Sequence, residues 1–204
     1  MDRQRKRRAR IAVLASGAGS AFRHLVDESR TGRLPAEIAL LITTKADAPV
    51  AEHAGRAGVE HLFLDATELD PDLVDGAIRQ ALVDHEIDLV VLAGYLRKIG
   101  PRTLAAFAGR ILNMHPAPLP AFGGPGMHGE RVHQAVLSAG VRHSAATIHL
   151  IDADYDTGPV IAEQPVPVHP DDSAATLQER VQAAERDLLV STLAALVTSW
   201  QARG

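Results

Sequence analysis

Two side chains suited to acid–base chemistry stand two residues apart near the middle of the chain, in Asn113-Met114-His115-Pro116. In an extended strand, residues i and i+2 point to the same face, so the Asn113 amide and the His115 imidazole would lie side by side. The amide can donate a hydrogen bond to a developing oxyanion, and the imidazole can carry a proton near neutral pH. Because Pro116 stops the strand, we expect both groups at a strand end that opens into a crevice.

A glycine-rich turn near the N-terminus suggests anion binding. Residues 16–20 read Ser-Gly-Ala-Gly-Ser after a short apolar run, and such glycines let backbone N–H groups approach a phosphate at a helix N-terminus. The alternative is a tight turn in which Ser20 only caps the helix. Phe22 stands three residues after Gly19 and no Gly-Lys-Ser/Thr follows, so NAD and ATP binding are both disfavoured.

Carboxylates that could partner His115 follow a later strand. Alternation over residues 146–151 puts Thr147 and His149 on one face, so His149 is either a satisfied buried histidine or a second imidazole of the site. The turn that follows contains Asp152, Asp154 and Asp156. Aspartates in turns usually bond the local backbone, but one brought to His115 would favour the charged ring and raise its pKa.

Short apolar runs alternate with helical segments along the chain. Expected strands cover residues 11–15, 38–42, 61–64, 89–93, 111–113, 146–151 and 160–166, and expected helices cover 20–29, 49–57, 71–85, 101–108, 134–137 and 174–200. This pattern predicts an α/β, Rossmann-like fold: a mostly parallel sheet with helices on both faces and an antiparallel edge addition after residue 140. Function should gather at the carboxyl ends of the strands, near the Pro/Gly-rich loop of residues 117–126.

Composition limits the class of protein. The 204 residues are 46% hydrophobic, which predicts one domain over residues 11–204. Residues 1–10 hold six of the 21 basic residues and are expected to be a disordered basic leader, either a solvated tail or a weak electrostatic arm. The rest holds 15 basic and 24 acidic residues, a net charge of −9, which disfavours nucleic acid as a partner.

Targeting and metal signals are weak. The first apolar run is five residues long, whereas a signal peptide needs about 7–15, and no run approaches a membrane span, so no membrane partner is expected. The absence of cysteine excludes disulfides and thiolate chemistry and suits a cytoplasmic location. The ten histidines form no known metal-ligand spacing, so no metal is expected.

Taken in order, several segments resemble those of the folate-dependent formyltransferases. They are residues 16–20, Leu-Ala-Gly-Tyr-Leu-Arg at 92–97, Asn-Met-His-Pro-Ala-Pro-Leu-Pro at 113–120, Thr-Ile-His-Leu at 147–150 and Asp-Thr-Gly-Pro-Val-Ile at 156–161. The resemblance spans residues 11 to about 200. Over this whole span, the chain resembles the branch of the family that formylates glycinamide ribonucleotide in purine biosynthesis. It implies transfer of the formyl group of 10-formyltetrahydrofolate, as co-substrate, to the amino group of that ribonucleotide.

The resemblance also implies residue roles. The catalytic residues would be Asn113, His115 and Asp156, with Thr147 and His149 in support. The ribonucleotide and its phosphate would be held by Gly17, Ala18, Gly19, Ser20 and Glu185, and the folate by Tyr95, Leu96, Arg97, Lys98, Ile99 and Asp152. The chain departs from the family pattern at Ala21, Pro125 and Ala145, in the loops and not in the three catalytic positions.

Three other functions share these features. Methionyl-tRNA formyltransferases and formyltetrahydrofolate hydrolases use the same catalytic block, but they usually carry an extra domain, whereas here the catalytic region fills the chain. The acidic body also argues against a tRNA substrate. A non-catalytic nucleotide-binding module would be expected to lose one of the three polar groups, and all three are present. We therefore expect small-molecule substrates and a monomer or homodimer.

Overall fold

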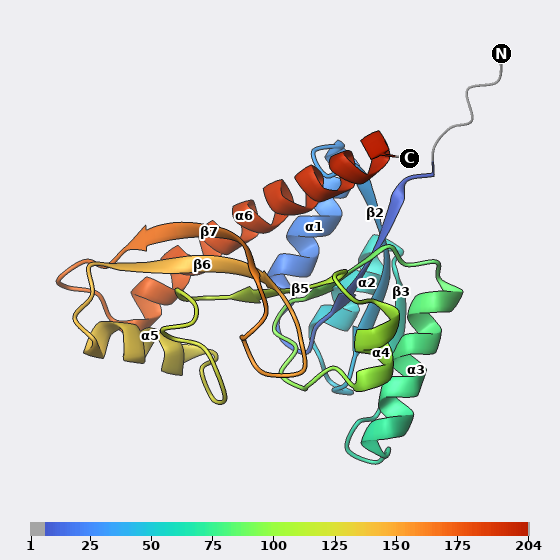
Figure 1. The fold of residues 1–204 in the computed structure, drawn as a ribbon, viewed down its shortest axis with the longest axis horizontal. Helices are drawn as coiled ribbons and strands as arrows, with labels where there is room; N and C mark the ends of the chain where they lie inside the picture. Colours follow the sequence, from blue (N-terminus) through green and yellow to red (C-terminus); the bar gives the residue numbers. More distant parts are fainter. Residues whose placement is uncertain (1–6, 204) are drawn as a thin grey trace.

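Seven strands form one sheet in the computed structural model, which describes residues 7–203 (Figure 1). The strands are β1 (Ala9–Leu14), β2 (Ala36–Thr43), β3 (Glu60–Phe63), β4 (Leu89–Leu92), β5 (Ile111–His115), β6 (His143–Leu150) and β7 (Val160–Pro167). Their order in the sheet is β3-β2-β1-β4-β5-β6-β7. The first five are parallel, whereas β6 pairs antiparallel with both β5 and β7. The Rossmann-like class and the antiparallel addition after residue 140 are confirmed.

Helices cover both faces of the sheet, as the apolar strands predict. They are α1 (Ser20–Thr31), α2 (Val50–Ala57), α3 (Pro71–Asp84), α4 (Pro101–Ala106), α5 (Glu130–Ser138) and α6 (Ala174–Arg203). One apolar cluster joins the sheet to α1, α2 and the second half of α6, and another joins the opposite face to α3 and the segment around α4. A third cluster packs α5 against the first half of α6. The helix expected over residues 134–137 is longer and begins at Glu130.

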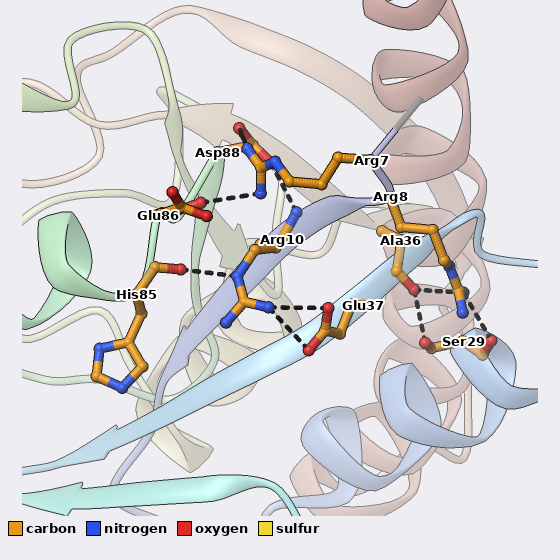
Figure 2. A network of polar contacts seen from close by, with 9 residues as sticks. All are labelled: Arg7, Arg8, Arg10, Ser29, Ala36, Glu37, His85, Glu86 and Asp88. Atoms are coloured by element: carbon orange, nitrogen blue, oxygen red, sulfur yellow. Dashed lines mark hydrogen bonds and ion pairs between the residues drawn. The ribbon is translucent and has the colours of Figure 1, made fainter. Parts of the chain in front are cut away.

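The start of the chain differs from the expected disordered leader. Within the described residues, β1 already begins at Ala9, and Arg7, Arg8 and Arg10 bond to neighbouring elements (Figure 2). The Arg7 guanidinium lies 2.8 Å from a carboxylate oxygen of Asp88, and one Arg8 nitrogen donates to the Ala36 carbonyl at 2.7 Å. The leader prediction is therefore wrong for residues 7–10, because backbone and carboxylate acceptors from distant segments meet these arginines.

Residues 1–6 lie outside the described residues, and the prediction of one domain over residues 11–204 stays a prediction. Among residues 7–203, no helix is both long enough and apolar enough to span a membrane.

Candidate active site

A cavity of about 510 Å³ opens at the carboxyl ends of β1, β4 and β5. The sheet order places β1 beside β4, so the chain leaves these neighbouring strands toward opposite sides of the sheet. Such a switch point is where open α/β sheets bind ligands. The cavity is lined by all of the predicted site residues except Thr147. The segments singled out in the sequence thus line one cavity at this end of the sheet, and the roles of their residues stay predictions.

Asn113 and His149 face one another across the antiparallel pair of β5 and β6. They are register partners, and Asn113 Nδ2 lies 3.0 Å from His149 Nε2. The next register pair is His115 with Thr147, whose hydroxyl donates to the Ala117 carbonyl at 2.8 Å. Thr147 thus holds the chain after β5 and does not reach the cavity. His149 lines the cavity and is at the same time a buried histidine with polar partners, so both alternatives describe its position and its role in the site stays a prediction.

His115 is held between a carbonyl and a carboxylate. Its Nε2 lies 2.8 Å from the Phe122 carbonyl oxygen, and its Nδ1 lies 3.6 Å from Asp156 Oδ2. The same Asp156 oxygen accepts the Gly124 N–H at 2.9 Å, and the other lies 3.5 Å from His149 Nε2. Asp156 has a φ of 57°, a left-handed conformation that few residues other than glycine adopt. The loop after β6 therefore turns its carboxylate back onto both imidazoles.

Burial and neighbouring groups shift the pKa values of His115 and Asp156. His115 is 3% exposed, and loss of solvent lowers the pKa of its ring although the Asp156 charge raises it. The expectation of a raised His115 pKa is wrong for the free protein, because burial outweighs the carboxylate. Burial raises the pKa of Asp156, but its contact with His149, the hydrogen bond from the Gly124 N–H and the charge of His115 outweigh burial, so that pKa lies below its usual value.

The glycine-rich turn presents a helix N-terminus to the cavity. Helix α1 begins at Ser20, and the residue at its N-cap is Gly19, with φ of 76° and no side-chain capping bond. Ser20 is therefore the first helical residue and not the cap, and the anion-binding role of the turn stays a prediction. A Cβ on Gly19 would lie 2.5 Å from Val50 Cγ2, so this close approach of α2 requires glycine. The first N–H groups of α1 lack helical partners and carry the positive end of its dipole.

Glu185 lies on α6 in the same wall of the cavity. It is 6% exposed, and burial raises the pKa of its carboxyl to about 7 although Arg186 lowers it. Gln182 precedes it by one helical turn and lines the cavity with it. This wall offers amide groups and a carboxyl that is partly neutral near pH 7.

The segment predicted to bind folate, residues 95–99, forms another wall of the cavity. Tyr95 is buried, and burial raises the pKa of its phenol to about 12. Lys98 Nζ donates to the Ala153 carbonyl at 3.1 Å, which ties the segment to the loop after β6. Asp152 accepts the Thr157 hydroxyl at 2.6 Å and the Asp154 N–H at 3.1 Å, so it lines the cavity while making the local bonds typical of turns. The loops after β4 and β6, two strands that are separated by β5 in the sheet, thus both line the cavity.

Further polar residues that the sequence did not single out as site residues also line the cavity. Among them are His128 before α5, His133 on α5, Gln178, Gln182 and Arg186 on α6, and Tyr155 after β6. The helical spacing of residues 178, 182 and 185 could have indicated the α6 residues. Among the described residues, no cluster of three or more His, Cys, Asp or Glu side chains could hold a metal ion, and the expected absence of a metal stays a prediction.

Comparisons with known proteins agree on one family. The formyl transferase family model matches residues 9–193. A phosphoribosylglycinamide formyltransferase from Mycobacterium tuberculosis is 47% identical over 191 residues, which are 93% of this chain and 86% of that protein. The crystal structure of phosphoribosylglycinamide formyltransferase from Bacillus halodurans superposes with a TM-score of 0.85 at 39% identity, covering 92% of this chain and 95% of that one.

A more distant structure shares the fold alone. A formyltetrahydrofolate deformylase from Pseudomonas syringae is 21% identical with a TM-score of 0.82, and the match covers 95% of this chain and 63% of the deformylase chain. The family match spans most of the chain, and the more similar relatives match over most of their own lengths. The chain belongs to the formyl transferase family and is a relative of the phosphoribosylglycinamide formyltransferases.

Proposed function

We propose that this protein transfers the formyl group of 10-formyltetrahydrofolate to the amino group of glycinamide ribonucleotide in purine biosynthesis. The observation that carries the proposal is the convergence of three polar side chains, Asn113, His115 and Asp156, in one cavity between a glycine-rich helix N-terminus and the predicted folate segment. The relatives named for this reaction match nearly the whole chain. Both substrates are small molecules, and a cytoplasmic monomer or homodimer remains part of the proposal.

The two substrates would enter from different walls. The ribonucleotide phosphate is a dianion near neutral pH, and the free N–H groups at the start of α1, next to Gly17, Ala18 and Gly19, are suited to bind it. Glu185 lines the same cavity on α6 and would contact the ribonucleotide. The folate would lie along Tyr95 to Ile99 opposite Asp152. The amine and the formyl carbon would then meet at the end of β5.

The reaction forms one negative and one positive charge, so the site must stabilise the first and remove a proton from the second. Attack of the neutral amine on the formyl carbon forms a tetrahedral species with an oxyanion and an ammonium. The Asn113 amide and the protonated His115 ring would stabilise the oxyanion. Burial disfavours the protonated ring in the free protein, but the negative charge of the oxyanion would favour it during the reaction. Asp156, ionised because its pKa is low, would accept the ammonium proton directly or through water. As the bond between the formyl carbon and the folate nitrogen breaks, that nitrogen takes up the proton through Asp156 or His115, and tetrahydrofolate and the formylated ribonucleotide are released.

The test is an assay of the purified protein with 10-formyltetrahydrofolate in the presence and absence of glycinamide ribonucleotide. Folate absorbance reports loss of the formyl group. We expect turnover only when the ribonucleotide is present, with one formylated ribonucleotide formed for each folate consumed. Turnover without the ribonucleotide would instead indicate a hydrolase, and no turnover in either mixture would indicate a binding module.

A further inference from the structure

His149 is a fully buried imidazole with both ring nitrogens engaged. It is 0% exposed, its Nδ1 lies 2.8 Å from the Leu150 carbonyl oxygen, and its Nε2 lies 3.0 Å from Asn113 Nδ2. Its Nε2 is also 3.5 Å from Asp156 Oδ1. The same nitrogen therefore faces both an amide and a carboxylate.

The backbone carbonyl determines which nitrogen carries the proton. A carbonyl oxygen only accepts hydrogen bonds, so Nδ1 of His149 must be the donor to Leu150. In the neutral ring, Nε2 is then a lone-pair acceptor, and the group of Asn113 that faces it must be the N–H₂ and not the oxygen. One N–H of Asn113 is used by this bond. The second is left for an acceptor in the cavity that Asn113 lines.

We propose that His149 is a positioning residue that locks the side-chain amide of Asn113 with an N–H, and not its oxygen, toward the reacting formyl oxygen. The inference rests on the proposed function. An amide rotated by half a turn would present its oxygen to the developing oxyanion, and two negative oxygens would then repel each other. The lock is built into the sheet, because Asn113 and His149 are register partners on β5 and β6.

A proton-transfer role for His149 makes a different prediction from a positioning role. A proton carrier must exchange its proton with the substrate or with Asp156, and no amide side chain can replace it. A positioning residue needs only an acceptor at the place of Nε2. Asparagine retains an N–H near the Nδ1 position but ends short of Nε2, whereas glutamine carries an amide oxygen at about the depth of Nε2.

The experiment compares His149→Asn with His149→Gln, both checked for folding by thermal unfolding. We expect His149→Asn to lower kcat about 10²-fold, near the loss of one oxyanion donor, with both KM values within about threefold of the original protein. We expect His149→Gln to recover kcat to within about tenfold of that protein, because the acceptor is restored. Equal large losses in both variants would indicate a proton carrier and overturn the proposal, as would near-normal kcat in both.

A double-mutant cycle with Asn113→Ala tests the coupling directly. If His149 acts through Asn113, adding His149→Asn to Asn113→Ala should lower kcat by less than about twofold further. Multiplication of the two losses would show independent roles and overturn the proposal.

A measurement on the unmodified protein covers the case in which a variant fails to fold. Ring ¹⁵N NMR of the free protein should show His149 protonated at Nδ1 and not at Nε2, and the opposite tautomer would overturn the inference. This readout does not require turnover. A protein that has the expected tautomer but does not formylate the ribonucleotide would contradict the proposed function and not the geometry of the lock.

Discussion

The two ends of the parallel strands carry polar networks of opposite character. At the amino ends, Arg7 and Arg10 form ion pairs with Asp88 and Glu37 at 2.8 and 3.0 Å. Every side chain of these two pairs is at least partly exposed to solvent. At the carboxyl ends, the His115 and His149 rings are buried and Asp156 is mostly covered, and the distances from the two rings to the carboxylate are longer, at 3.6 and 3.5 Å.

We infer that the ion pairs at the amino ends stabilise the fold, whereas the groups at the carboxyl ends are placed to contact a ligand. Exposed ion pairs are screened by water, so short distances there contribute little free energy. Buried ionisable groups have lost solvent, and their charges respond strongly to whatever enters the cavity. Changes at the carboxyl ends should therefore alter turnover or pH dependence, whereas changes at the amino ends should alter stability slightly and leave turnover intact.

The largest effect is expected from Asp156→Asn. The amide keeps the shape of the side chain but cannot accept the ammonium proton or favour the charged His115 ring, so kcat should fall by about 10²–10³-fold. The thermal midpoint should change little. Steady-state kinetics with both substrates measures the loss, and Asp84→Asn, at an exposed position on α3, is the matched control. A folded Asp156→Asn protein with a near-normal rate would remove the carboxylate from the mechanism.

The next effect concerns the pH dependence of stability at Glu185. Burial raises its pKa from 4.5 to about 7 in the folded state, so the folded protein holds a proton that the unfolded chain has lost. The stability linked to this group is therefore complete below pH 4.5 and is lost as the pH rises through 7. The free energy of unfolding should decrease over this window by up to about 3 kcal/mol.

Glu185→Gln isolates this contribution, because glutamine resembles the neutral acid at every pH. Urea unfolding of the ligand-free protein should give similar stabilities for the variant and the original chain near pH 4.5, and a more stable variant above pH 7. Glu179→Gln, exposed on the same helix, should follow the original chain throughout. Parallel curves for Glu185→Gln and the original chain would show that the Glu185 carboxyl is ionised in the fold.

Much of the carboxyl-end network could be predicted from the sequence, because it depends on local rules. Alternation along β5 places Asn113 and His115 on one face, and apolar runs that alternate with helices direct the strand ends to one edge. The sign of the His115 pKa shift could not be predicted in this way. It depends on how deeply the folded chain buries the ring, which is a matter of tertiary packing.

The amino-end network was less predictable, since its partners are far apart in the sequence. Six cations in ten residues are typical of a solvated tail when the acceptors are unknown. Arg10 meets a carboxylate of Glu37 and the carbonyl of His85 only because β2 and the segment before β4 flank β1. Charge patterns along a chain do not contain that information.

A smaller effect is expected from Gly19→Ala. The added Cβ would press on Val50 at a φ of 76°, so the turn must shift and the N–H groups at the start of α1 would move from the phosphate. The KM for the ribonucleotide should rise about tenfold, with the KM for the folate little changed. Gly32→Ala is the control, since it has a φ of 84° but no atom within 4 Å of the added Cβ. An equal rise in the KM for the ribonucleotide in both variants would show that backbone strain alone causes the change.

The smallest effect is expected from Arg10→Ala, at the other end of the same strand (Figure 2). The substitution removes the bonds to Glu37 at 3.0 Å and to the His85 carbonyl at 2.7 Å. Because the pair is partly exposed, stability should fall by about 1 kcal/mol or less, and by less again at about 1 M salt, where screening weakens the Glu37 contribution. Denaturant unfolding at two salt concentrations measures this, with kcat measured beside it. A loss of turnover comparable to that of Asp156→Asn would mean that the amino ends position the catalytic strands, and the separation between the two networks would fail.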